Sequence, residues 1–174
     1  HRGFVRATAK KLYGAHILFP KVSVGATKNC LMAATLAEGE SILENCAREP
    51  EIIDLAQFLV KLGAKIEGVG RQTMRITGVP RLEPTDYSVV ADRIEVGTYL
   101  VAAAITEGEI VIERCRPAHL NSLVDLLREM GQEIEAGDDF LKIRGRRPVR
   151  PITVSTEPYP GFPTDLHPQL DRKS

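Results

Sequence analysis

Apolar residues recur at three- and four-residue spacing in two stretches of the chain. In the first stretch these residues are Ile52, Leu55, Ala56, Leu59 and Leu62, and in the second they are Leu120, Leu123, Val124, Leu127 and Met130. The spacing predicts two amphipathic helices, each with one apolar face. A glycine follows each stretch, and we expect Gly63 and Gly131 to end the helices.

Shorter runs with strand character flank both predicted helices. A β-branched run precedes each helix, at residues 42–43 and 110–112, and two short alternating segments follow it. These segments cover residues 65–67 and 74–76 in the first case, and 133–135 and 141–143 in the second. An Ala-rich helix is expected before each run, with Gly39 and Gly108 as C-caps. Extended segments over residues 15–24 and 87–96 precede these helices.

The elements occur twice in the same order because the sequence is duplicated. Four blocks match at a nearly constant offset: residues 32–39 with 102–108, 41–46 with 110–115, 62–67 with 130–135, and 75–78 with 142–145. Chance similarity would not keep one order over four blocks. The fold class is therefore predicted as α/β, with repeated βαβαββ units whose mixed sheets are covered by helices.

Two Pro-rich segments divide the chain. The loop at residues 80–86 separates the copies and predicts two domains, 1–86 and 87–174. A strand-like run at 152–156, followed by a Pro-rich passage up to Asp165, is interpreted as the opening of a third unit. The start at residues 1–4 resembles the interior of a sequence, and the tail at 171–174 has no apolar face. We therefore expect the chain to be a piece of a longer protein, with a truncated or foreign end.

Composition narrows the possible partners. The 23 Lys and Arg balance the 23 Asp and Glu, so the chain has no global basic field that would attract nucleic acid. No apolar run is long enough to span a membrane. Three cysteines without a CxxC pair predict free thiols in a reducing, cytoplasmic compartment. Neither a metal site nor a cofactor is expected, because the histidines form no ligand-spaced cluster (His1, His16, His119, His167).

The segment from Lys21 to Gly25 is the first candidate site. It combines a cation, the Ser23 hydroxyl and a glycine just before the first Ala-rich helix, which suits a phosphate or diphosphate. Helix capping alone is the alternative, because many strand-to-helix turns use Gly and Thr for that purpose. The second copy favours binding, since its matching loop, taken as residues 96–99, is shorter and has Glu95 in place of a cation.

Asp165 is the second candidate. It follows a Pro- and Gly-rich segment whose prolines fix the backbone, which suits a general base, although an N-cap role is the alternative. The charged cluster at residues 48–51 opens a helix, where acids complement the macrodipole. Cys46 and Cys115 occupy the same position in both copies, and Cys30 lies in an Ala-rich helix, so all three are interpreted as core residues.

Six motifs together closely resemble the UDP-N-acetylglucosamine 1-carboxyvinyltransferase family, rather than its shikimate-pathway relative. They are Lys21-Val-Ser-Val-Gly-Ala-Thr27, Leu36-Ala-Glu-Gly39, Asn45-Cys-Ala-Arg-Glu-Pro-Glu-Ile52, Leu62-Gly-Ala-Lys-Ile66, Asp92-Arg-Ile-Glu95 and Phe162-Pro-Thr-Asp165. The likeness runs from about residue 3 to Leu170. It implies an inside-out α/β barrel of repeated units in two domains. Two complete units and the start of a third would be present here, covering the end of one domain and the beginning of the other.

The resemblance also implies an activity. Members of this family transfer the enolpyruvyl group of phosphoenolpyruvate to the 3-hydroxyl of UDP-N-acetylglucosamine, the first committed step of bacterial peptidoglycan synthesis and hence of cell-wall formation and cell division. Asp165 would contact the sugar 3-hydroxyl as a proposed general base, with Thr164 near the sugar and Arg93 close to the ligand. The segment that would hold the diphosphate comprises Lys21, Val22, Ser23, Val24 and Gly25.

The chain departs from the family in several places. The N-terminal Lys-Asn pair, the loop with the reactive Cys, and the later arginines that bind phosphoenolpyruvate have no counterpart. Lys28-Asn29 and Cys115-Arg116-Pro117 match those motifs in letters only, because their places in the repeat differ. We therefore expect no transferase activity from the chain alone. A non-catalytic repeat scaffold and a nucleotide-sugar-binding module are the alternatives, and exposed apolar helix faces favour self-association.

Overall fold

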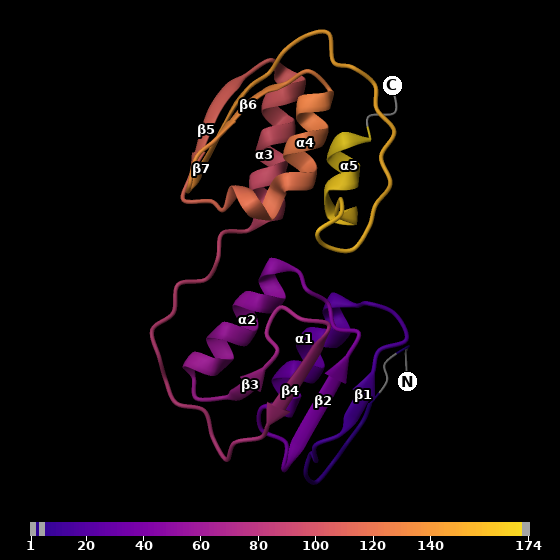
Figure 1. Cartoon of the computed structure of the whole chain (residues 1–174), viewed down its shortest axis with the longest axis vertical. Coiled ribbons are helices and arrows are strands. Elements are labelled where there is room, and N and C mark those ends of the chain that lie inside the picture. The colour runs from indigo at the N-terminus through magenta and orange to yellow at the C-terminus, as the bar shows by residue number, and fades with distance from the viewer. Residues whose placement is uncertain (1–2, 4–5, 172–174) are drawn as a thin grey trace. The chain divides into compact units, whose positions relative to one another are not determined.

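A computed structural model describes residues 3 and 6–171, which fall into two compact units, His1–Ser88 and Val89–Ser174 (Figure 1). The expectations for the two ends of the chain rest largely on residues 1, 2, 4, 5 and 172–174, which lie outside this description. That the units are the end of one domain and the beginning of another stays a proposal.

The first unit has the predicted βαβαββ order. Its elements are β1 (His16–Leu18), α1 (Val24–Ala34), β2 (Glu40–Glu44), α2 (Pro50–Lys61), β3 (Lys65–Glu67) and β4 (Thr73–Thr77). The sheet order is β1-β2-β4-β3; β1 runs parallel to β2, and the other pairs are antiparallel. Both helices pack on one face of this mixed sheet, where Leu31, Leu43, Ile52, Met74 and Ile76 are fully buried (Figure 1).

The second unit repeats this arrangement with one strand fewer. Its elements are α3 (Arg93–Thr106), β5 (Glu109–Glu113), the 3-10 turn η1 (Pro117–Leu120), α4 (Asn121–Glu129), β6 (Glu133–Ala136), β7 (Phe140–Arg144), the 3-10 turn η2 (Thr164–Leu166) and α5 (His167–Leu170). The antiparallel sheet has the order β5-β7-β6. A separate core contains Leu100, Leu123, Leu127, Leu141 and Ile143. The α/β fold class is thus confirmed.

The segment before α3 is not the predicted strand. The Asp92 carboxylate accepts hydrogen bonds from the backbone N–H groups of Ile94 (2.7 Å) and Glu95 (3.3 Å), so the helix begins at Arg93. Residues 93–96, predicted as extended, are therefore helical, and residues 96–99 are not a loop. Without this strand, the described part of the second unit has an antiparallel sheet instead of the predicted mixed one.

The prediction that Gly39 and Gly108 are helix C-caps is wrong. The helix α1 ends at Ala34, where the Thr35 N–H and hydroxyl bond to the preceding turn, and α3 ends with Glu107 in the left-handed region (φ 57°). Gly39 and Gly108 therefore lie beyond the C-caps. Gly39 directly precedes β2, and Gly108 directly precedes β5. In contrast, Gly63 and Gly131 follow α2 and α4 with φ of 99° and 95°, as predicted.

The predicted opening strand of a third unit is also absent. Residues 152–155 belong to no strand, and Thr156 forms only an isolated bridge with Phe162. Pro151 directly precedes the run and Pro158 closely follows it, and proline lacks the N–H that a sheet ladder requires. Val154 and Phe162 instead pack against the core of the second unit.

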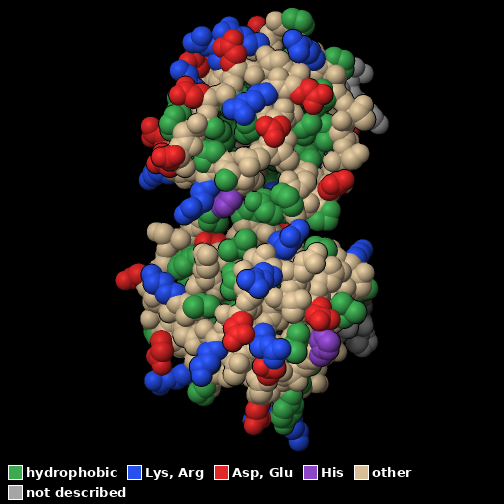
Figure 2. Space-filling view, in the orientation of Figure 1, with side chains coloured by type: hydrophobic (Ala, Val, Ile, Leu, Met, Phe, Trp, Pro, Cys, Tyr) green, Lys and Arg blue, Asp and Glu red, His purple; other side chains and the backbone are tan. Residues whose placement is uncertain are grey.

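Acidic and basic side chains are intermixed on the visible surface of each unit, as a formal net charge of zero leads one to expect (Figure 2). Within the described residues, no helix is both long and apolar enough to cross a membrane.

Candidate functional site

The Lys21 segment forms the start of α1. Ser23 is the N-cap: its backbone is extended, and its Oγ accepts a hydrogen bond from the Ala26 N–H at 3.3 Å. Val24 and Gly25, predicted as loop residues, form the first helical turn, so their N–H groups have no acceptor within the helix. Lys21 and Gly25 are exposed, and the first turn contains no acidic residue.

This arrangement suits an anion. Free N–H groups and the helix macrodipole favour negative charge at the N-terminus, and Lys21 adds a full positive charge beside it. A Cβ on Gly25 would meet no atom within 4 Å, and no left-handed backbone requires glycine there. Packing within the unit therefore gives no reason for glycine, whereas close approach of a ligand would. Ser23 capping is observed and is compatible with such a ligand.

The second unit differs at the equivalent helix start. Asp92 and Arg93 there occupy the places of Ser23 and Val24, so the earlier match with residues 96–99 was wrong. The Asp92 carboxylate already accepts hydrogen bonds from the Ile94 and Glu95 N–H groups, and its negative charge would repel an anion at this helix start. Arg93 is only 8% exposed, and its guanidinium lies 5.7 Å from the centre of the Tyr159 ring.

Asp165 and Thr164 are exposed on the turn η2, between Pro163 and the buried Leu166. The N-cap of this turn is Pro163, and no side chain caps it. The alternative that Asp165 is an N-cap is therefore wrong. Its carboxylate makes no hydrogen bond to the turn and is accessible.

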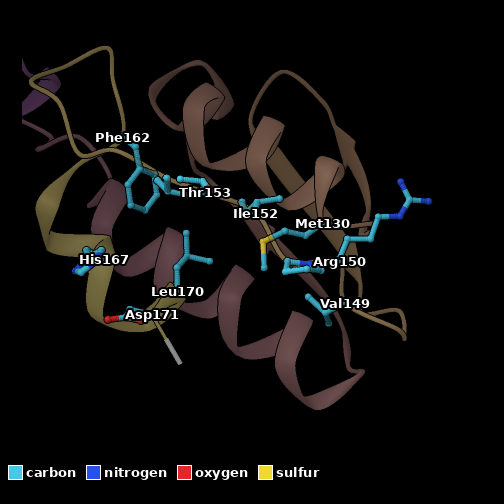
Figure 3. Close-up of a pocket in the computed structure, with 11 residues that line it drawn as sticks. Met130, Val149, Arg150, Ile152, Thr153, Phe162, His167, Leu170 and Asp171 are labelled. Atoms are coloured by element: carbon cyan, nitrogen blue, oxygen red, sulfur yellow. The ribbon is translucent and has the colours of Figure 1, made fainter. Parts of the chain in front are cut away.

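A cavity of about 490 Å³ lies beside this turn in the second unit (Figure 3). Its lining combines apolar side chains, among them Met130, Ile152, Phe162 and Leu170, with the polar residues Arg150, Thr153, His167 and Asp171. The guanidinium of Arg150 extends away from these side chains. Neither Thr164 nor Asp165 lines the cavity, so it is not the predicted sugar site.

The cysteines have the character of core residues. Cys46 and Cys115 are buried, and each donates its S–H to the backbone carbonyl three residues earlier. Burial raises the pKa of the Cys46 thiol to about 11 and also raises that of Cys115, which makes both poor nucleophiles. Cys30 is half-buried against the first core, so it is less enclosed than predicted.

Glu49 is a buried polar residue at the start of α2. It precedes α2, its side chain is only 7% exposed, and Oε2 has no hydrogen-bond partner among the described residues. The Thr27 hydroxyl accepts from the Ala47 N–H at 3.0 Å, which brings this segment beside the first turns of α1. Burial was the missing signal, since the sequence shows only acids at a helix start. No group of His, Cys, Asp and Glu within residues 3 and 6–171 could hold a metal ion.

The predicted residues thus form two separate groups. Lys21, Val22, Ser23, Val24 and Gly25 are contiguous at the start of α1 in the first unit. Arg93, Thr164 and Asp165 belong to the second unit, where α3 packs against η2 and α5.

Comparison with known proteins identifies relatives over nearly the whole chain. UDP-N-acetylglucosamine 1-carboxyvinyltransferase from Koribacter versatilis is 47% identical over 167 residues, covering 96% of this chain and 39% of the relative. The protein of that name from Geobacter metallireducens is 52% identical over 168 residues, covering 97% and 40%. The chain therefore spans about two fifths of the length of these curated relatives.

Solved structures agree with these sequence matches. The enolpyruvyl transferase NikO from Streptomyces tendae superposes with a TM-score of 0.79 at 26% identity, over 94% of this chain and 42% of that one. EPSP synthase from Acinetobacter baumannii superposes with a TM-score of 0.57 at 26% identity, over 82% and 34%. A family model described as EPSP synthase (3-phosphoshikimate 1-carboxyvinyltransferase) matches residues 3–173. The chain therefore belongs to the EPSP synthase family of carboxyvinyltransferases.

Proposed function

We propose that this chain is part of a transferase that moves the enolpyruvyl group of phosphoenolpyruvate to the 3-hydroxyl of UDP-N-acetylglucosamine. The names of the relatives at 47% to 52% identity support this choice of acceptor. The observation that carries the proposal is the free helix start of α1, where Lys21 stands beside the unpaired N–H groups of Val24 and Gly25. The reaction would belong to bacterial peptidoglycan synthesis in the cytoplasm.

The diphosphate of the sugar nucleotide would bind at this helix start. Lys21 supplies charge, the Ser23 hydroxyl and the N–H groups of Val24 and Gly25 supply donors, and Gly25 lets the phosphate approach the backbone. Val22 precedes the N-cap and packs partly against the first core, which holds the segment in place.

The residues of the second group would act at the 3-hydroxyl of the sugar. Asp165 is exposed, and its carboxylate does not cap the turn. It would take the proton of the 3-hydroxyl as that oxygen forms a bond to C2 of phosphoenolpyruvate, and C3 would gain a proton. The tetrahedral intermediate would then lose phosphate and a proton from C3, giving the enolpyruvyl ether. Thr164 would flank the sugar. Arg93, held over Tyr159, would lie close to the ligand.

Titration of the chain with UDP-N-acetylglucosamine tests the proposal. We expect weak binding that Lys21→Ala weakens about tenfold, which corresponds to about 1.4 kcal/mol, close to the lower end of the range for a hydrogen bond to a charged group. Lys28→Ala is the matched control, because Lys28 is an exposed lysine in the second turn of α1, away from the helix start. Binding should also weaken as salt rises.

Three outcomes would count against the proposal. Equal effects of Lys21→Ala and Lys28→Ala would show that binding depends on charge alone and not on the helix start. No detectable binding at millimolar ligand would favour a non-catalytic repeat scaffold. Saturable binding without any contribution of Asp165 would favour a nucleotide-sugar-binding module.

A further inference from the structure

The turn that carries Asp165 is held on α3 by an apolar contact. Leu166, the next residue, is fully buried and packs against Gly97 and Leu123. A Cβ on Gly97 would lie 2.8 Å from Leu166 Cδ1 and 2.9 Å from Leu123 Cδ2. The missing side chain at residue 97 therefore makes the space that Leu166 occupies.

A hydrogen bond holds the other end of the same segment. Gln169 Nε2 donates to Thr98 Oγ1 at 3.0 Å, and the Thr98 hydroxyl donates to the Ile94 carbonyl at 2.8 Å. Because the single hydroxyl proton of Thr98 is used on Ile94, its oxygen must accept, and the amide nitrogen of Gln169 must face it. Gln169 Oε1 is buried without a partner in the described part of the chain. An unpaired buried oxygen is destabilising, so stability alone does not account for Gln169.

The first unit serves as an internal control. Counted from the N-caps Ser23 and Asp92, Gly97 and Thr98 correspond to Lys28 and Asn29. Both of these residues are exposed on α1. The helix itself therefore requires neither a glycine nor a hydroxyl at these positions. The small residue and the hydroxyl occur only in the copy of the helix that receives the Asp165 turn.

We propose that Gly97, Thr98 and Gln169 form a seat for this turn, in which Thr98 and Gln169 are positioning residues for Asp165. Gly97 admits Leu166, the residue directly after Asp165, and the Thr98–Gln169 bond fixes the same segment three residues further on. The Ser122 hydroxyl, which donates to the Gly161 carbonyl at 3.3 Å, holds the approach to the turn on α4. The role of Asp165 itself rests on the proposed function.

Backbone ¹⁵N relaxation of the whole chain tests the seat. Thr98→Val keeps the shape of the side chain and removes the hydroxyl, Gln169→Met keeps the length and removes the amide, and Thr98→Ser retains the bond. We expect order parameters of about 0.85 for the amides of residues 164–166 in the unaltered chain and below about 0.6 in the first two variants. Thr98→Ser should behave like the unaltered chain. Methyl signals of Leu100 and Leu141 should stay in place in all of them.

Unchanged order at Asp165 in both Thr98→Val and Gln169→Met would overturn the seat. If Thr98→Val shifts the Leu100 signal, Gln169→Met decides alone, since Gln169 lies outside the second core.

Addition of UDP-N-acetylglucosamine separates positioning from mere structure. Thr98→Val should abolish the ligand-induced shift of the Asp165 amide and leave that of the Gly25 amide unchanged. Equal losses at both amides would contradict a positioning role. A chain without any ligand-induced shift, whose variants still lose order at Asp165, would keep the seat and reject the proposed function.

Discussion

The side chain of Thr27 joins α1 to the segment that follows β2. It is fully buried, and its hydroxyl accepts a hydrogen bond from the Ala47 N–H at 3.0 Å. Thr27→Val removes the acceptor and leaves a buried N–H unpaired, so we expect the free energy of unfolding to fall by about 1–3 kcal/mol. Urea denaturation followed by circular dichroism measures this loss.

Thr27→Ser is the matched control for that substitution. It keeps the hydroxyl and removes one methyl group, for which about 0.8 kcal/mol is expected. If the valine variant proved as stable as the serine variant, the hydrogen bond to Ala47 would contribute nothing. Neither change touches Lys21, so nucleotide-sugar binding provides a second comparison.

The three thiols differ in burial and should differ in reactivity. With a pKa of about 11, the Cys46 thiol is ionised to only about one part in a thousand at pH 8, and it is also shielded. We expect iodoacetamide to modify half-buried Cys30 first, with Cys46 and Cys115 reacting only after unfolding. Peptide mass mapping over time gives the order. Rapid alkylation of Cys46 in the folded chain would contradict its assignment to the core.

At the scale of elements, residues 80–87 lie against α2 as a strap. Tyr87 Oη donates to Asp54 Oδ1 at 2.9 Å, its ring lies 5.0 Å from that of Phe58, and the Glu83 N–H bonds to the Leu62 carbonyl at 2.8 Å. Lys61 Nζ donates to the Asp86 carbonyl at 2.6 Å. The predicted loop between the copies is thus fixed by specific contacts up to Tyr87.

Removing these contacts should loosen the strap without unfolding the unit. Tyr87→Phe loses the hydroxyl bonds, so we expect about 0.5–1.5 kcal/mol less protection against hydrogen exchange at the Glu83 amide. Tyr87→Ala also loses the ring contact and should have the larger effect. Val89→Ala, at an exposed residue beyond the strap, is the control. Equal exchange at Glu83 in all variants would show that the backbone holds the strap by itself.

Hydrophobic periodicity and turn glycines in the sequence correctly predicted the helices and hairpins that depend mainly on neighbouring residues. Helices α2 and α4 and the hairpins after them followed from periodicity and from Gly63 and Gly131, whose backbone needs a left-handed turn. The start of α3 was missed because the Asp92 cap, one side chain, overrides an extended pattern. The residues of the Lys21 segment are contiguous, so the sequence alone could group them as a candidate site, and their role stays a prediction. Burial of Glu49 and the fit of Leu166 on Gly97 depend on tertiary packing, which no local pattern contains.

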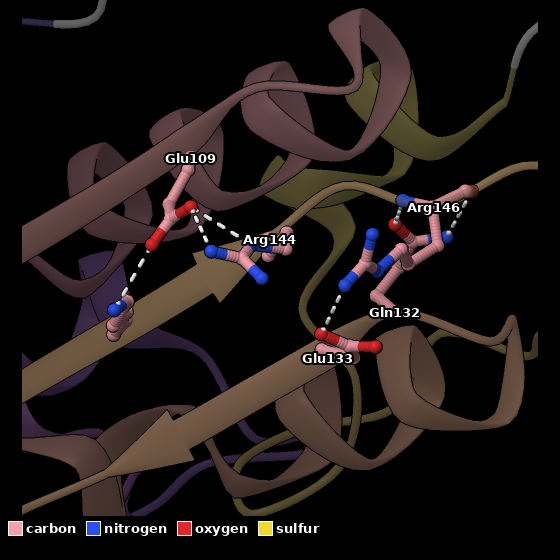
Figure 4. Close-up of polar contacts among 6 residues, drawn as sticks. Glu109, Gln132, Glu133, Arg144 and Arg146 are labelled. Carbon is pink, nitrogen blue, oxygen red and sulfur yellow. Dashed lines mark hydrogen bonds and ion pairs between the residues drawn. The ribbon is translucent and has the colours of Figure 1, made fainter.

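Across the whole molecule, ion pairs make the second sheet sensitive to acid. Hydrogen bonds from Lys142 and then Arg144 lower the pKa of Glu109 below its ordinary 4.5, and Arg146 lowers that of Glu133 in the same way (Figure 4). A depressed pKa in the folded state means that the stabilisation is complete above pH 4.5 and is lost as pH falls through the folded-state pKa.

We therefore expect acid to loosen β5, β6 and β7 below about pH 4.5. Hydrogen exchange at the Leu141 amide across pH measures the effect. Glu109→Gln and Glu133→Gln should flatten the pH dependence and lower the stability at neutral pH. These pairs are exposed, so added salt should reduce the difference between pH 7 and pH 4. A pH dependence that both variants retain would assign the acid sensitivity to other groups.

The complete reaction would need binding groups for two anionic substrates. Phosphoenolpyruvate and the diphosphate together carry several negative charges, and among the described residues Lys21 is the one cation placed at the proposed diphosphate site. Since the chain spans 39% to 40% of its curated relatives, we expect these 174 residues alone to release no phosphate from phosphoenolpyruvate and UDP-N-acetylglucosamine. A phosphate-release assay checks this. If phosphate is released above background and Asp165→Asn abolishes that release, the Lys21 segment and the Asp165 turn suffice for turnover, and the expectation of an inactive chain is wrong.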